Sequence, residues 1–186
     1  MRTKLLALAV VGAAVVVGVA FAALALGDTS SEANVSPGKT ANIEGLTWSV
    51  VATKQRPRIA IPDGGLTYTA RNGVYLILEL RLENASGGAA RAVGEYVSLI
   101  GADGKRYGLD EDGSTAYHLT LGPHRHDPAL YEPTRPDPVY GFFDVPVGTA
   151  RAASMTFDLP RKALNGTPLL EVRPPDGSRT AFEIDL

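Results

Sequence analysis

Three histidines lie close together and could bind a metal ion. His118, His124 and His126 fall within nine consecutive positions, and Asp127 follows directly. In an extended segment His124 and His126 project to the same side. Imidazole and carboxylate groups are ligands that zinc and copper accept. The alternative is a solvated loop, because spacing this loose also arises by chance.

Four acidic residues form a second candidate, a calcium site. Asp110, Glu111 and Asp112 are consecutive, and Asp103 lies seven positions before Asp110. Their oxygens suit Ca²⁺, although the later bidentate glutamate of a full calcium loop is missing. The alternative is an acidic hairpin tip that keeps a sheet edge soluble.

Carboxylates elsewhere do not form a catalytic pattern. Glu79 and Glu83 flank Arg81 on one expected strand. At about 3.3 Å per residue they would stand about 13 Å apart, too far for a glycosidase pair. No G-x-S-x-G elbow and no glycine-rich phosphate loop occurs in the sequence. We therefore expect a protein that is not an enzyme and that needs no cofactor.

A proline-rich stretch between Leu121 and Val139 is the preferred contact surface. Tyrosine and arginine are enriched at binding hot spots, and proline lowers the ordering cost of a loop on binding. The alternative is that the tyrosines pack on the edge of the sheet. The candidate contact residues in and near this stretch are Tyr117, Arg125, Tyr131, Arg135 and Tyr140.

The first 27 residues predict export from the cytoplasm. Arg2 and Lys4 precede an uncharged apolar run over residues 5–26. Such a run is a cleavable signal peptide or a retained anchor helix, and its length meets the roughly 20 residues that a spanning helix needs. Both interpretations place the N-terminus inside the cell and the remaining chain outside. The chain has no cysteine, so neither a lipidated cysteine nor a disulfide is expected.

The balance of acidic and basic residues indicates which class of partner to expect. Removing Arg2 and Lys4 leaves 16 of the 18 basic residues against 20 acidic ones. Nucleic-acid-binding domains carry a basic face, so this mildly acidic chain argues against nucleic acid. Another envelope protein or a small ligand remains the expected partner. The membrane would be contacted through residues 5–26 if they are not cleaved, and the oligomeric state stays open.

The remaining sequence predicts a linker and one all-β domain. Residues 28–41 are small and polar, as in a flexible linker. From residue 42 to 186 apolar residues alternate in short runs separated by glycine and proline, which indicates strands. Trp48 is expected to point inward, and no stretch has sustained helical periodicity. Strands are expected at residues 46–52, 58–61, 74–82, 96–100, 106–109, 139–145, 152–159, 169–173 and 180–184, with a short run at 115–121.

Three segments carry a resemblance to a known family. They are the long strand Gly73–Asn84, the hairpin Gly101–Tyr107 and the stretch Gly141–Pro146. In this order they resemble a large family of secreted bacterial domains of unknown function, which is related to telokin-like proteins and to a mycobacterial immunoprotective extracellular antigen. The resemblance implies an immunoglobulin-like β-sandwich of about seven to nine antiparallel strands after an N-terminal hydrophobic helix. It also implies an extracytoplasmic binding module of the cell envelope, with no catalytic residues.

Overall fold

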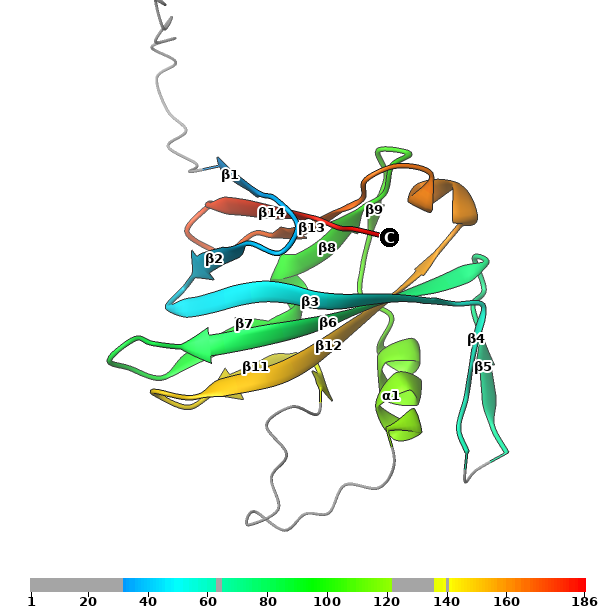
Figure 1. Ribbon diagram of the computed structural model, residues 1–186, viewed down its shortest axis with the longest axis horizontal. Helices are drawn as coiled ribbons and strands as arrows, with labels where there is room; N and C mark the ends of the chain where they lie inside the picture. Colours follow the sequence, from blue (N-terminus) through cyan, green and yellow to red (C-terminus); the bar gives the residue numbers. More distant parts are fainter. Residues whose placement is uncertain (1–31, 63–64, 122–135, 140) are drawn as a thin grey trace, which may run out of the picture.

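The structure is a computed structural model that describes residues 32–62, 65–121, 136–139 and 141–186. Within these ranges the chain forms a β-sandwich-like arrangement of two five-stranded sheets with additional short strands (Figure 1). The expected β-sandwich is therefore confirmed. The expected N-terminal hydrophobic helix lies outside the described residues.

One sheet contains both ends of the described chain, and we call it the terminal sheet. In spatial order it consists of β1 (Glu32–Val35), β14 (Arg179–Glu183), β13 (Leu169–Val172), β8 (Val97–Ile100) and β9 (Arg106–Tyr107). The turn between β8 and β9 uses Gly104 at a φ of 73°, a left-handed conformation that glycine adopts without strain. The hairpin expected at Asp103–Gly104 is thus confirmed.

The second sheet contains the longest strands, and we call it the long sheet. In spatial order it consists of β10 (Asp137–Pro138), β12 (Ala150–Leu159), β6 (Val74–Asn84), β3 (Leu46–Arg56) and β2 (Thr40–Ile43). Two further pairs complete the strands: β7 (Ala90–Val93) with β11 (Phe142–Val145), and β4 (Arg58–Ala60) with β5 (Thr67–Thr69). Short 3-10 helices occupy Gly94–Tyr96 and Arg161–Leu164.

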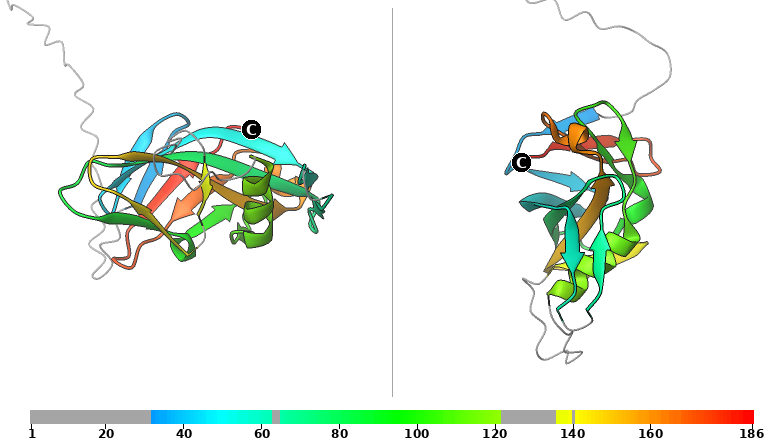
Figure 2. Two further views of the ribbon diagram at one scale, coloured as in Figure 1. Left: turned by 90° about the horizontal axis from the view of Figure 1, so that it is seen from below. Right: turned by 90° about the vertical axis from the view of Figure 1, so that its right-hand side faces the viewer.

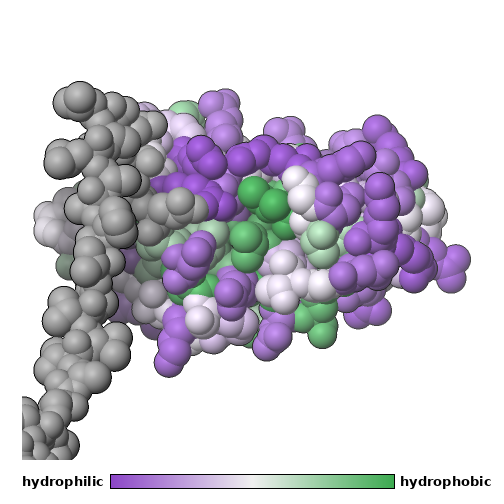
Figure 3. Space-filling model, turned by 90° about the horizontal axis from the view of Figure 1, so that it is seen from above, coloured by the Kyte–Doolittle hydropathy of each residue, from purple (hydrophilic) through white to green (hydrophobic). Residues whose placement is uncertain are grey.

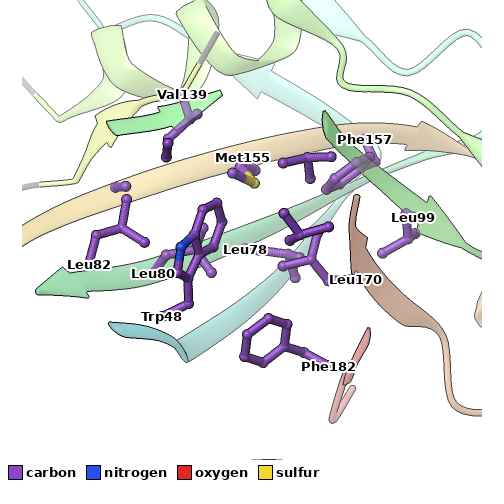
Figure 4. Close-up of a cluster of buried hydrophobic side chains, with 14 of the residues drawn as sticks. Trp48, Leu78, Leu80, Leu82, Leu99, Val139, Met155, Phe157, Leu170 and Phe182 are labelled. Atoms are coloured by element: carbon purple, nitrogen blue, oxygen red, sulfur yellow. The ribbon is translucent and has the colours of Figure 1, made fainter. Parts of the chain in front are cut away.

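The core lies between the two large sheets. Apolar side chains at alternate positions of β6 and β12 face the terminal sheet, as their period of two predicts. Trp48 points into this core with 2% of its surface exposed, which confirms the expected inward orientation. The side chains labelled in Figure 4 are Trp48, Leu78, Leu80, Leu82, Leu99, Val139, Met155, Phe157, Leu170 and Phe182.

The outer face of β6 is also covered. Tyr75 and Ile77 belong to a second buried cluster, which includes Ile59 of β4 and two residues of a helix, Ala116 and Tyr117. This helix, α1 (Glu111–Thr120), packs beside β4 and β5 against the long sheet (Figure 2). A strand whose two faces are both apolar needs cover on both sides, because exposed apolar surface is unfavourable in water.

Helix α1 occupies most of the region where the sequence predicts a short run at residues 115–121 and no sustained helical periodicity. Its N-cap is Asp110, whose carboxylate accepts a hydrogen bond from the Gly113 amide, and Glu111 and Asp112 lie in its first turn. Cap and acidic turn both favour a helix start. The weakly amphipathic sequence then becomes helical because Ala116 and Tyr117 pack onto Ile77.

Three other expectations are wrong: those about the linker, the number of strands and the strand directions. The segment 28–41, expected as a flexible linker, contains β1 and the start of β2, because backbone pairing with β14 and β3 needs few apolar side chains. The described residues contain fourteen strands rather than seven to nine, since several are two to four residues long. The pairs β1–β14 and β10–β12 are parallel, so the strands are not all antiparallel.

No helix in the described ranges is long and apolar enough to cross a membrane. The run over residues 5–26, for which a membrane span or signal peptide is expected, lies outside those ranges.

The cap of α1 gives a first testable prediction. Replacing Asp110 by Ala removes the acceptor for the Gly113 amide and should lower the free energy of unfolding by about 1 kcal/mol. Asp112→Ala is the matched control. Asp112 lies in the same first turn, but the interactions assigned to it are an exposed ion pair with Arg71 at 3.6 Å and a favourable position near the helix N-terminus, so its loss should cost about 0.5 kcal/mol. Urea unfolding of both variants measures the difference, and equal losses would contradict the assigned cap.

Candidate functional site

Of the predicted contact residues and of the predicted ligands around the histidines, only two fall within the described ranges. Tyr117 and His118 are neighbours on α1. The others lie outside those ranges, and their roles stay predictions: Arg125, Tyr131, Arg135 and Tyr140 as contacts, and His124, His126 and Asp127 as metal ligands.

Tyr117 is part of a polar triad on the outer face of the long sheet. Its ring is buried, so it is not the exposed contact expected of it. The Tyr117 hydroxyl donates to the Glu79 carboxylate on β6. The Lys54 ammonium on β3 donates to Glu79 Oε1 at 2.5 Å and contacts the Tyr117 hydroxyl at 2.7 Å. Three elements therefore meet at this triad: β3, β6 and α1.

The triad holds each member in its ordinary charge state. Burial disfavours the charged form of Lys54, but hydrogen bonds to Glu79 and Tyr117 raise the pKa of Lys54 overall. Burial likewise opposes ionisation of Glu79, yet the bonds from Lys54 and Tyr117 lower its pKa. Burial and the bond to Glu79 raise the pKa of Tyr117. An acid–base catalyst needs a pKa near the working pH, and all three shifts lead away from neutrality.

His118 forms part of a second polar cluster at the other side of α1. Its Nδ1 lies 3.9 Å from Asp137 Oδ1 on β10. The other oxygen of Asp137 accepts a hydrogen bond from Arg151 Nη2 at 2.7 Å, and the Arg151 guanidinium stacks 4.6 Å from the centre of the Phe143 ring. Asp137 therefore connects α1 to β12. The described residues contain no group of three metal-ligating side chains.

The acidic residues proposed for calcium are used separately. Asp110 caps α1, and Asp112 pairs with Arg71. Asp103 accepts a hydrogen bond from the Tyr107 hydroxyl at 3.0 Å and lies 3.6 Å from the Lys162 ammonium. These carboxylates belong to different local structures, and no group of three metal-ligating side chains occurs among the described residues, so nothing in that part of the chain supports the candidate calcium site.

Glu171 on β13 is the centre of an ion-pair cluster that sequence reasoning missed. Its side chain has no exposed surface, and three arginines cover it. Arg173 Nε donates to Glu171 Oε1 at 2.8 Å, and Arg106 and Arg179 each contact a carboxylate oxygen. Burial opposes ionisation of Glu171, but the bonds from Arg173 and Arg106 hold its pKa below the usual range. The one signal in the sequence that could have indicated this cluster is the charged Glu171 between the apolar Leu170 and Val172 in an expected strand.

The small β7–β11 pair carries the most exposed aromatic side chain of the described residues. Phe142 is 68% exposed. The Arg91 guanidinium lies 5.1 Å from the centre of the Phe142 ring, and Arg91 Nε lies 3.1 Å from Asp144 Oδ1. Arg91 and Asp144 face each other across the ladder, so the side chains form a row that we call the Phe142 row. The surface of this pair therefore exposes one aromatic ring beside an Arg91–Asp144 ion pair.

The chain matches no known family model and no curated protein. Among solved structures it is similar to the yjhA protein from Bacillus subtilis, with 10% identity, a TM-score of 0.51, and coverage of 81% of this chain and 99% of that one. A conserved hypothetical protein from Bacillus anthracis gives 11% identity, a TM-score of 0.50, and coverage of 73% and 87%. An uncharacterized beta-sandwich protein from Clostridium difficile gives 11% identity, a TM-score of 0.47, and coverage of 86% and 98%. At these identities the likeness concerns the fold alone.

The triad yields a pH-dependent stability prediction. Glu79→Gln should lower the free energy of unfolding by about 1.5 kcal/mol at pH 7, because it removes the charge that Lys54 and Tyr117 contact. The folded-state pKa of Glu79 is lowered, so its contribution is complete above the ordinary value of 4.5 and is lost as the pH falls through the folded-state pKa. The difference between the two proteins should therefore shrink in acid.

Glu83→Gln is the matched control on the same strand. Glu83 forms an exposed pair with Arg81 at 3.4 Å, so its replacement should change stability by less than about 0.5 kcal/mol. Urea unfolding at pH 7 and at pH 3.5 measures both variants. A Glu79→Gln effect that is as small as the control, or that grows in acid, contradicts the assigned role.

Proposed function

We propose that this chain is a non-enzymatic binding module that works outside the cytoplasm, in the bacterial cell envelope. The uncharged run over residues 5–26 after Arg2 and Lys4 supports the location. The likeness of Gly73–Asn84, Gly101–Tyr107 and Gly141–Pro146 to secreted domains supports it further. We also propose that the sandwich is immunoglobulin-like and related to the telokin-like proteins.

The Phe142 row is the observation on which the binding role rests. Phenylalanine and arginine side chains are enriched at the cores of protein interfaces, and both occur here in contact with one another. The backbone of β11 is held by its ladder to β7, so little conformational entropy would be lost when a partner covers Phe142. The predicted contact Tyr140 stands two positions before Phe142 in the sequence. A partner that presents an apolar pocket would fit this row.

The state of the titratable clusters supports a role without catalysis. Glu79 and Glu171 are both held as carboxylates by cationic neighbours, and Lys54 is held as an ammonium. Such groups position side chains but exchange protons poorly at neutral pH. These groups therefore favour a binding role over general acid–base chemistry.

Metal binding through His118, His124 and His126, with Asp127, is the alternative proposal. His118 and Asp137 are near enough to share a metal with ligands from the following stretch of sequence. An added mass equal to one metal ion, measured on the intact native protein, tests this alternative.

Site-specific cross-linking tests the binding surface. A photoreactive phenylalanine analogue at position 142, in the full chain produced in its native host, should give a discrete adduct on irradiation. The analogue at Val147, which is 53% exposed and follows β11, is the matched control and should give none. Unlabelled wild-type protein should compete with adduct formation, whereas the Phe142→Ala protein should not. Equal adducts at both positions, or competition by Phe142→Ala, would refute the proposal.

Fractionation followed by intact mass tests the location. The full-length chain in the membrane fraction, or a species that begins near residues 23–27 in the medium, is the expected result. The full-length chain in the cytoplasmic fraction would contradict the proposed location. Under native conditions, an added mass that equals one zinc or copper ion would support the alternative of metal binding, and its absence after zinc addition would remove that alternative.

A further inference from the structure

Strand β3 has an edge that the long sheet leaves open. Strand β2 pairs with β3 only from Leu46 to Ser49, whereas β6 pairs with β3 as far as Arg56. Within the described ranges, residues 50–56 make no ladder to any strand on the β2 side. Alternate residues of this segment direct their backbone N–H and C=O groups away from β6, and these groups require a hydrogen-bonding partner. An open edge is therefore a template for another strand.

A groove runs along the start of this edge. Its cavity volume is about 290 Å³, and its lining residues are Pro37, Gly38, Val50, Val51, Ala52, Thr53, Glu183 and Asp185. The groove thus lies between β3 and the end of the chain, which is held there by a hydrogen bond of 2.7 Å from the Thr53 hydroxyl to the Asp185 carbonyl. The turn after β1 supplies Pro37 and Gly38.

Strand β3 forms one wall of the groove, and this wall is apolar and partly exposed. Pairing between β3 and β6 shifts register at Val51, and this β-bulge leaves Val51 59% exposed. Val50 and Ala52 beside it are half-buried. Hydrophobic side chains also gather near the middle of the face seen from above in Figure 3, with hydrophilic ones around them. Alternate side chains of an added strand would find apolar contacts on this wall.

The opposite wall is acidic. Glu183 and Asp185 both line the groove, and neither forms an ion pair with another described residue. The nearest cation in sequence on β3, Lys54, lies on the outer face of the sheet and is bound to Glu79. Two carboxylates without counter-charges favour a cationic ligand group.

We propose that the groove and the open edge of β3 bind an extended segment of a partner protein that carries a basic side chain. The segment adds a strand to the long sheet beyond the end of β2, its apolar side chains contact Val50 to Ala52, and its lysine or arginine faces Glu183 and Asp185. This surface lies at β3, whereas the Phe142 row lies on β11, so the two sites are separate. The inference holds or fails independently of the proposed role of Phe142.

Fluorescence anisotropy with labelled peptides tests the charge preference. The probe is a heptapeptide of alternating threonine and valine with a central lysine, titrated with the full chain in mild detergent. It should bind about tenfold more tightly than the same peptide with a central glutamate, because the carboxylates of Glu183 and Asp185 attract the lysine and repel the glutamate. Equal affinities, or no binding of the lysine peptide, would overturn the proposal.

Variants of the two carboxylates test the groove itself. The double variant Glu183→Gln, Asp185→Asn should bind the lysine peptide about three- to tenfold more weakly. The control double variant Glu83→Gln, Asp112→Asn removes the same amount of negative charge away from the groove, and it should leave the affinity for the lysine peptide unchanged. Phe142→Ala should also leave that affinity unchanged. Equal weakening by both double variants would show that net charge alone acts, and would refute the assigned groove.

Hydrogen exchange tests the backbone pairing. With the lysine peptide at ten times its Kd, the amides of residues 50–56 that face the open edge should exchange about tenfold more slowly. Peptides N-methylated at alternate residues, in either of the two frames, should differ in affinity, because only one frame removes the donors that face β3. Binding without protection of residues 50–56 would exclude strand addition even if the charge preference held.

Discussion

The burial of β6 on both faces is the constraint on which the structure depends. One face of this strand packs in the core between the sheets, and the other presents Tyr75 and Ile77 to a second cluster. A strand with two apolar faces cannot stand at the surface of a two-layer sandwich without a third element over it. Helix α1 and the β4–β5 pair supply that cover. Their placement then brings Tyr117 and His118 to the polar groups at the rim of the covered area.

The polar clusters mark the borders of this cover. Lys54, Glu79 and Tyr117 lie where α1 meets β3 and β6, and His118, Asp137 and Arg151 lie where it meets β10 and β12. Each cluster satisfies charges that would otherwise be stranded near apolar surface. Specific geometry of this kind selects one docking position for the helix, whereas apolar contacts alone would tolerate small shifts. The clusters are best understood as fixing the helix in register with the sheet.

The sequence predicts those parts of the structure that depend on local patterns, and it misses those that depend on contacts between residues far apart in the chain. Alternation along β6 and β12, the inward Trp48 and the Asp103–Gly104 hairpin follow from local patterns and are confirmed. Helix α1 has only a weak periodic pattern, because its stability comes from contact with Ile77 on a distant strand. Strand β1 has only four residues, with Val35 alone in the core, and its pairing with β14 joins residues from opposite ends of the described chain. The arginines around Glu171 likewise converge from three separate segments, which no local pattern reveals.

The parallel pairing of β1 with β14 determines how the domain responds to mechanical force. Four residue pairs join these strands, from Glu32 with Arg179 to Val35 with Phe182. A pull on the chain before β1, opposed by a hold on the chain after β14, draws the two strands past each other along their length. All rungs of the ladder then resist together, instead of opening one after another as in a peeled hairpin. A tether that enters through β1 would therefore load the domain in shear, the direction in which a β-ladder is strongest.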